Sequence, residues 1–256
     1  MSSEKQIEFT KENIDDYLKD VAKEYRKQIG KGMPAEIILI GGASVLVNYG
    51  FREMTTDVDA LIHAASAMKD AINRVGDHYG LPYGWLNQDF TKTDSYSPNL
   101  AQYSEFYKTY SNVLTVRTIA AEYLIAMKLR SGRQYKSDLS DVLGILAEHE
   151  KRKTPITMEQ IQAAVTALYG GWDALPESSR SFIENVMQDG RFEELFAQVV
   201  SGEKETKSLL LRFEQDYPGV LQQTNVGEIV GGLQEKASQA SVLAKLREKK
   251  SGSDAK

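Results

Sequence analysis

The fold is decided by the stretch Glu36-Ile37-Ile38-Leu39-Ile40-Gly41-Gly42-Ala43-Ser44. Its apolar run is too short for a buried helix and ends at two glycines, so it predicts a central strand followed by a tight turn. A short helix fits 43–49. The later stretch Asp57-Val58-Asp59-Ala60-Leu61-Ile62 predicts a second strand, because polar and apolar residues alternate before the run becomes fully apolar. The predicted order is therefore strand, glycine pair, short helix, strand.

Amphipathic helices are predicted on both sides of this unit. Upstream, apolar residues at 14, 18, 21 and 25 indicate a helix that begins at the N-cap Thr10 and ends at Gly30 or Gly32. Downstream, we expect a helix over 65–78, an irregular segment over 80–87 and a hairpin formed by 104–110 and 113–118. From 119 onward the predicted elements are all helices, over 120–131, 138–149, 158–169, 178–188, 191–200, 204–216 and 226–248.

Strands are thus confined to the first half of the chain. This distribution predicts an α/β (α+β) fold in which a small mixed sheet flanked by helices precedes an all-helical C-terminal half. The charged run 148–153 indicates a boundary near residue 150. We therefore expect an α/β domain over 1–150, a helical domain over 151–250 and a disordered tail over 251–256, which is too polar to bury anything.

Composition excludes several classes of function. Thirty-one Lys and Arg against 36 Asp and Glu give a net charge of −5, so no global positive field attracts nucleic acid and any contact with RNA must be local. The chain has no cysteine, which excludes disulfides and thiolate chemistry, and its three histidines are too dispersed for a metal motif. No apolar run approaches the ~18 residues of a membrane span, and the N-terminus does not resemble a signal peptide. We expect no membrane association and a cytoplasmic location.

Two aspartates and the glycine pair form the candidate site. Asp57 and Asp59 lie two residues apart on a strand, so both carboxylates project to the same face. Such a pair favours Mg²⁺ (or Mn²⁺), which binds carboxylate oxygens and keeps positions open for substrate phosphates. Gly41 and Gly42 let the backbone approach a phosphate, and Ser44 adds a hydroxyl near the start of a helix. The combination predicts a site for a metal and an NTP, although a glycine pair alone also fits an ordinary turn.

This order of elements resembles the nucleotidyltransferase superfamily with the DNA polymerase β-like fold. Gly41-Gly42-Ala43-Ser44 together with Arg52-x-x-Thr55-Thr56-Asp57-Val58-Asp59 is similar to the bacterial nucleotidyltransferases related to AbiEii and MenT, the toxins of type IV toxin–antitoxin and abortive-infection systems. A second block, 122–129 followed by Arg133-Gln134-Tyr135-Lys136-Ser137-Asp138-Leu139-Ser140-Asp141, resembles the two conserved-type helices of those toxins. The resemblance covers about 36–150 and implies that Arg52 and Thr56 contact the nucleotide.

The resemblance also implies that Lys128 is catalytic. Considered without the family, Lys128 lies at the edge of an apolar stripe, where a lysine usually extends its amine to solvent. An amine aimed at the two aspartates would instead neutralise charge that builds on a transferring phosphoryl group. We favour this catalytic interpretation.

Asp138 and Asp141 lie one turn apart at the start of a predicted helix, with Ser137 as its N-cap. Acids in a first turn also stabilise the helix dipole, by roughly 0.3–1 kcal/mol each. The resemblance implies that an aspartate of this helix enters the active site. We favour Asp138, because it lies beside the apolar stripe of the helix, and expect Asp141 to lie farther round toward solvent.

The leading hypothesis is a metal-dependent nucleotidyltransferase that moves a nucleoside monophosphate from an NTP to an acceptor. The resemblance implies that the acceptor is tRNA or a protein, and that the chain is a toxin or phage-defence effector with a cognate antitoxin. Polymerase-like transferases usually carry a third carboxylate, and the sequence offers no secure one. A catalytically degenerate nucleotide-binding or scaffold module therefore stays an alternative, as does a small-molecule (aminoglycoside-type) nucleotidyltransferase.

Overall fold

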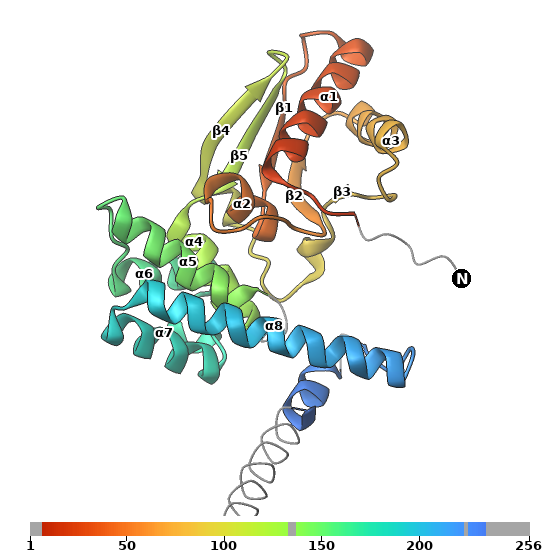
Figure 1. Cartoon of the computed structure of the whole chain (residues 1–256). Helices are drawn as coiled ribbons and strands as arrows, with labels where there is room; N and C mark the ends of the chain where they lie inside the picture. The colour runs from red at the N-terminus through yellow and green to blue at the C-terminus, as the bar shows by residue number, and fades with distance from the viewer. Residues whose placement is uncertain (1–6, 133–136, 223–224, 234–256) are drawn as a thin grey trace, which may run out of the picture.

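A five-stranded mixed sheet lies at the centre of the computed structural model, which describes residues 7–132, 137–222 and 225–233 (Figure 1). The strands follow one another across the sheet in the order β3, β2, β1, β5, β4. Their bounds are β1 (Ala35–Leu39), β2 (Val58–His63), β3 (Leu86–Asn87), β4 (Ser104–Tyr110) and β5 (Leu114–Ile119). β1 runs antiparallel to β2 and parallel to β5, while β4 and β5 form the antiparallel hairpin. The predicted α/β fold class is confirmed.

β1 is the middle strand of the sheet, and its apolar residues are buried on both faces. Ile37 and Leu39 belong to a core that the sheet shares with α1 (Lys11–Ile29) and α3 (Ala67–Tyr79). Ile38, on the opposite face, belongs to a second core that extends into the helices of the C-terminal half. A strand buried on both faces has no need of alternating polarity, which explains the continuous apolar run of the sequence.

α1 and α3 lie side by side over one face of the sheet (Figure 1). Thr10 caps α1 through a capping box, in which its hydroxyl accepts from the Asn13 amide at 3.4 Å. α1 ends at Gly30, whose φ of 69° suits glycine. The cap and the end of the first predicted helix are therefore confirmed.

The remaining helices gather at the end of the sheet where β1 meets the glycine pair (Figure 1). They are α2 (Gly41–Asn48), α4 (Ala121–Ser131), α5 (Asp138–Lys151), α6 (Met158–Tyr169), α7 (Glu177–Asp189) and α8 (Phe192–Asp216), with single-turn 3₁₀ segments at Asp89–Lys92, Leu100–Tyr103 and Trp172–Ala174. One hydrophobic core joins α4 and α5 to α6 and α7, so apolar packing is continuous across residue 150. The helical layer thus begins at α4, and the division into domains at 150 stays a prediction.

Two local expectations differ from the structure, and a third falls partly outside the described residues. Leu86–Asn87, expected to be irregular, pairs with β2 and forms β3. The helices expected over 191–200 and 204–216 form the single helix α8, because Gly202 is tolerated in its interior. Residues 226–233 are helical as predicted, whereas 234–248 and the tail over 251–256 lie outside the described residues.

Phe51 packs the loop between α2 and β2 against the helical layer. A Cβ built on Gly144 of α5 would lie 2.5 Å from the Phe51 ring, so only glycine lets the ring rest against the helix. The same ring meets Phe196 of α8 edge-on, with 5.5 Å between ring centroids. The loop that carries Arg52 is therefore held by α5 and α8 together.

We expect Gly144→Ala to have a free energy of unfolding about 1–3 kcal/mol lower than that of Gly202→Ala, the usual cost of overpacking a core. Both substitutions gain the roughly 1 kcal/mol by which alanine exceeds glycine in helix propensity, so this gain cancels in the comparison. Urea unfolding measures the difference, with Gly202→Ala as the matched control, because a Cβ on Gly202 meets nothing within 4 Å. Equal stability of Gly144→Ala and Gly202→Ala would contradict the packing of Phe51 on α5.

Candidate functional site

Gly41 and Gly42, here called the glycine turn, form the start of α2 directly after β1. Gly41 has a φ of 54°, a left-handed conformation that favours glycine. A Cβ on Gly42 would lie 2.7 Å from the Thr55 hydroxyl and 2.9 Å from Nη2 of Arg52. The glycine turn therefore brings open backbone against a cation and a hydroxyl.

The two predicted metal-binding aspartates follow Thr55 in the sequence: Asp57 directly precedes β2, and Asp59 lies on β2. Thr55 is buried and donates its hydroxyl proton to Oδ1 of Asp57 at 3.2 Å. Asp57 is exposed and Asp59 is half-buried on β2, where its carbonyl accepts from the Ile40 amide at 2.9 Å. Thr56 is exposed, so it is Thr55 that lies between the glycine turn and Asp57. Sequence reasoning placed Thr55 in the motif but assigned it no role.

A buried ion-pair network joins α4 to α5. Nζ of Lys128 lies 2.9 Å from Oδ1 of Asp138 and 2.8 Å from Oδ2 of Asp141. That same Asp141 oxygen accepts from Nη1 of Arg52 at 2.5 Å. We call these four residues the Lys128 network. Through Arg52 it touches the glycine turn, so the structure brings the two sequence blocks of the candidate site into one place.

The network corrects two expectations about the start of α5. Asp141, expected to lie toward solvent, is buried to the same degree as Asp138 because Lys128 and Arg52 both pair with it. Ser137 occupies the N-cap position, but within the described ranges its side chain accepts no capping hydrogen bond. Arg133 and Lys136, which belong to the same sequence block, lie outside the described residues.

Ser44 is fully buried in α2, and its hydroxyl accepts from the Ile119 amide at 3.2 Å. This bond ties α2 to the end of β5. In this conformation Ser44 supports the site by fixing the helix that begins at the glycine turn. Its assignment as a phosphate contact stays a prediction.

The carboxylates around Lys128 favour its charged form. Burial alone would lower the pKa of Lys128, but the carboxylates of Asp141 and Asp138 outweigh it and hold the pKa above its ordinary value. Its side chain is only 10% exposed, so the amine does not extend to solvent as an isolated stripe lysine would. Two buried carboxylates and one buried amine thus depend on one another.

Glu203 of α8 also contacts the start of α5, and sequence reasoning did not find it. Its Oε1 accepts from the Ser140 amide at 3.2 Å, and its Oε2 accepts from the Ser140 hydroxyl at 2.7 Å. Burial, together with the nearby Asp141 and Asp138, raises the pKa of Glu203 above its ordinary value. The contact spans 63 residues, so no local pattern could indicate it.

A metal held by Asp57 and Asp59 would need further ligands from a bound phosphate or from water. Among the described residues, no group of three or more His, Asp or Glu is placed to hold a metal ion. Two neighbouring aspartates nevertheless suit Mg²⁺ or Mn²⁺, because such ions are commonly held by one or two carboxylates plus substrate phosphates. Asp57 and Asp59 would hold it, and phosphate oxygens would complete its shell.

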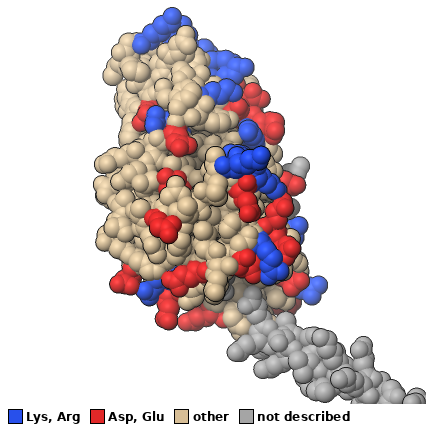
Figure 2. All heavy atoms as spheres, turned by 90° about the vertical axis from the view of Figure 1, so that its left-hand side faces the viewer, with Lys and Arg blue, Asp and Glu red and all other residues tan. Residues whose placement is uncertain are grey.

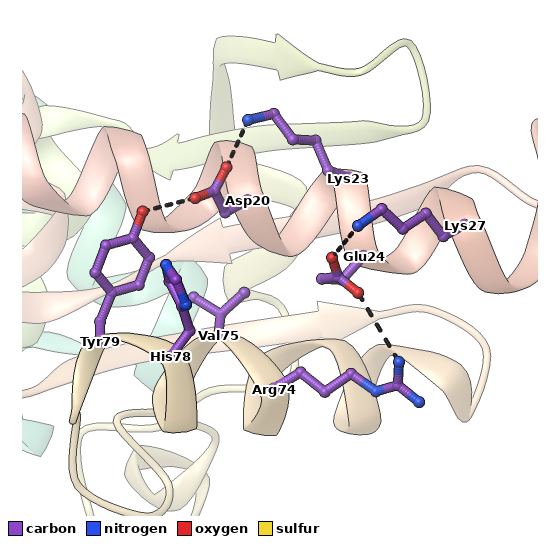
Figure 3. A pocket seen from close by; sticks show the side chains of 8 residues that line it. All are labelled: Asp20, Lys23, Glu24, Lys27, Arg74, Val75, His78 and Tyr79. Atoms are coloured by element: carbon purple, nitrogen blue, oxygen red, sulfur yellow. Dashed lines mark hydrogen bonds and ion pairs between the residues drawn. The ribbon is translucent and has the colours of Figure 1, made fainter.

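Other surface features of the described chain are separate from this site. A cavity of about 440 Å³ lies between α1 and α3 (Figure 3), and none of the predicted site residues lines it. Its charges are paired: Asp20 with Lys23 at 2.7 Å, and Glu24 with Lys27 at 2.5 Å. Figure 2 shows that on the face it presents, Lys and Arg interleave with Asp and Glu, mostly along one edge, and leave a broad uncharged area. That face therefore offers no continuous basic track.

The mixed sheet, the glycine turn and the strand-end aspartates are typical of α/β proteins that bind nucleotides. A family described as "Nucleotidyltransferase of unknown function (DUF6036)" matches residues 16–149, which is just over half of the 256-residue chain. The chain belongs to this nucleotidyltransferase family. No curated protein and no solved structure matches the chain. The narrower relation to AbiEii and MenT stays a prediction.

Removing the buried amine should destabilise the fold. We expect Lys128→Met to lower the free energy of unfolding by about 3–5 kcal/mol, because it leaves buried carboxylates without their shared cation. The triple variant Lys128→Met, Asp138→Asn, Asp141→Asn should recover most of this loss. Urea denaturation compares them, with the exposed Lys23→Met as control. A Lys128→Met protein as stable as wild type would show that the network does not form in solution.

Glu203→Gln should stabilise the protein at neutral pH and change nothing below about pH 4.5. Because the folded pKa of Glu203 is raised, the folded state binds the proton more tightly, and stability falls as pH rises from the ordinary value of 4.5 through the folded pKa. Glutamine removes this penalty and keeps one acceptor and one donor for Ser140. Melting temperatures at pH 4 and pH 7 test this, and an equal difference at both would contradict it.

Proposed function

We propose that this protein is a Mg²⁺-dependent nucleotidyltransferase that moves a nucleoside monophosphate from an NTP to an acceptor hydroxyl. One observation carries the proposal: Arg52 lies against Gly42 and pairs with Asp141 at the same time. This cation links the glycine turn, which would hold the phosphates, to the Lys128 network. Phosphoryl transfer needs phosphate-binding groups and cations close together.

Each residue has a distinct role in this proposal. The glycine turn and the first amides of α2 hold the triphosphate, since helix starts favour anions. Arg52 is the cation that contacts the phosphates, because its guanidinium borders the turn. Asp141 fixes the guanidinium, and Lys128 keeps Asp141 and Asp138 neutralised. Asp138 and Asp141 thus contribute indirectly, by holding Lys128 and Arg52 in position.

Asp57 and Asp59 would hold Mg²⁺, which when bound supplies Lewis-acid polarisation of the phosphate oxygens. The acceptor hydroxyl oxygen forms a bond to the α-phosphorus, and the bond from that phosphorus to the oxygen bridging to the β-phosphate breaks. Pyrophosphate leaves and the hydroxyl proton is released to water. The exposed Asp57 carboxylate leaves this edge open to an acceptor.

The finer proposal follows the resemblance of the two sequence blocks to AbiEii and MenT. The acceptor is tRNA or a protein side chain, and the protein acts as a toxin or defence effector beside a cognate antitoxin. No helix within the described ranges is long and apolar enough to span a bilayer. A cytoplasmic location is part of the same proposal.

A nucleotide-binding protein without transferase activity is the second candidate. The observation that favours it is the position of Lys128, whose amine is taken up by Asp138 and Asp141 rather than facing an open site. Such a protein would bind an NTP at the glycine turn and leave it intact.

Transfer assays separate the two candidates. The purified protein is incubated with each α-labelled NTP, Mg²⁺ and total cell RNA or protein. We expect label on an acceptor, and Arg52→Gln to lower the rate by ~10²-fold, which corresponds to ~2.7 kcal/mol of transition-state stabilisation.

Arg74→Gln serves as the matched control, because Arg74 is an exposed arginine of the α1 and α3 cavity. Its rate should equal that of wild type. NTP binding by wild type without any labelled product would favour the second candidate, and equal rates in Arg52→Gln and Arg74→Gln would remove Arg52 from the site.

A further inference from the structure

α8 lies outside the residues that match the family, yet it contacts the helix that carries half of the Lys128 network. Three contacts follow one another along α5. Lys151 pairs with Glu193 at the C-terminal end, Phe196 meets the Phe51 ring beside Gly144, and Glu203 reaches the first turn. α8 therefore follows α5 from its end to its start.

One backbone donor in the first turn of α5 is satisfied by a distant residue, Glu203. The first amides of any helix have no partner within the helix, and a side chain at the N-cap usually accepts from one of them. Ser137 is at that position with φ −75° and ψ 31°, and among the described residues its side chain makes no such bond. Glu203 accepts instead from the Ser140 amide, the third of the helix, and from the Ser140 hydroxyl.

Among the described residues, no ion pair with a cation holds Glu203 in this position. Asp138 and Asp141 carry like charges near Glu203, and the cations of the network, Lys128 and Arg52, pair with those aspartates. A side chain at the N-cap usually satisfies such an amide without that repulsion, but the side chain of Ser137 does not do so here. What Glu203 adds is a link between α8 and the turn that holds both aspartates.

We propose that Glu203 is a positioning residue of the transferase site, which caps α5 from α8 and so fixes Asp138 and Asp141 around Lys128. The proposal rests on the proposed function for its catalytic meaning. Loss of the cap frees the first turn of α5, Asp141 no longer holds Arg52, and the cation beside the glycine turn loses its fixed orientation. The C-terminal half thereby becomes part of the site.

Amide hydrogen exchange of the full-length protein tests the cap without any assay of activity. Glu203→Ala should accelerate exchange of the Ser140 amide by about tenfold or more, since it loses a hydrogen bond to a charged acceptor. Exchange in α6 should stay unchanged. Glu203→Gln should keep the protection, and Glu205→Ala, an exposed acid on the same helix, is the matched control.

Two results would overturn the cap. One is unchanged exchange of Ser140 in Glu203→Ala, and the other is a uniform acceleration through α6, which would reveal a merely structural contact. Should Glu203→Ala fail to fold, Glu203→Leu takes its place as the variant without a hydrogen-bond acceptor at position 203.

Transfer kinetics then test the positioning role. Glu203→Ala should lower the transfer rate at saturating NTP, and Glu203→Gln should restore it. If wild type transfers and Glu203→Ala matches it while Ser140 exchanges faster, the positioning role fails and the proposed function stands. If wild type neither binds nor transfers any NTP, the proposed function fails, and the positioning role fails with it whatever the exchange shows.

Discussion

The ion pairing of Lys128 with Asp138 and Asp141 is the constraint on which the rest of the site depends. Burying one amine and two carboxylates is costly, and it is tolerated only while every member keeps its partners. Arg52 supplies a further cation, and its loop is held by the packing of Phe51 on α5. The apolar core and the charged network therefore support one another, because the core sets the distance at which the charges meet.

The glycine turn is the second constraint, and this constraint is steric rather than electrostatic. Any side chain at Gly42 would collide with Thr55 and Arg52, so glycine is the condition for their approach to α2. The burial of Ser44 follows from the same geometry, since α2 must stay fixed against β5 for the turn to face β2. The start of α2 thereby combines a backbone without side chains and the neighbouring cation of Arg52.

Local patterns predicted most of the fold, because the elements that form it follow local rules. The capping box at Thr10 and the apolar run of β1 are both visible in a few consecutive residues. β3 was missed because a two-residue strand has no periodicity, and its pairing with β2 is decided by the rest of the sheet. The division of α8 was wrong because a single glycine costs a helix interior only about 1 kcal/mol, which does not end the helix at Gly202.

The candidate site was predictable only in its composition. The spacing of Asp57 and Asp59 predicts a shared face, but no local pattern indicates that Asp141 is buried, because its burial depends on an arginine 89 residues away. Glu203 is an extreme case, because it lies in a part of the chain without any motif and its partner Ser140 belongs to another helix.

These long-range partners bear on how the two halves of the chain relate. Apolar residues of α4 and α5, among them Leu124 and Val142, share one core with Ile161 of α6 and Ile183 of α7. A chain ending near 150 would expose that surface to water, at a cost that scales with the apolar area uncovered. It would also remove the acceptor of the Ser140 amide. The helical half is therefore a condition for the geometry of the site, even though the residues proposed to contact the nucleotide all precede it.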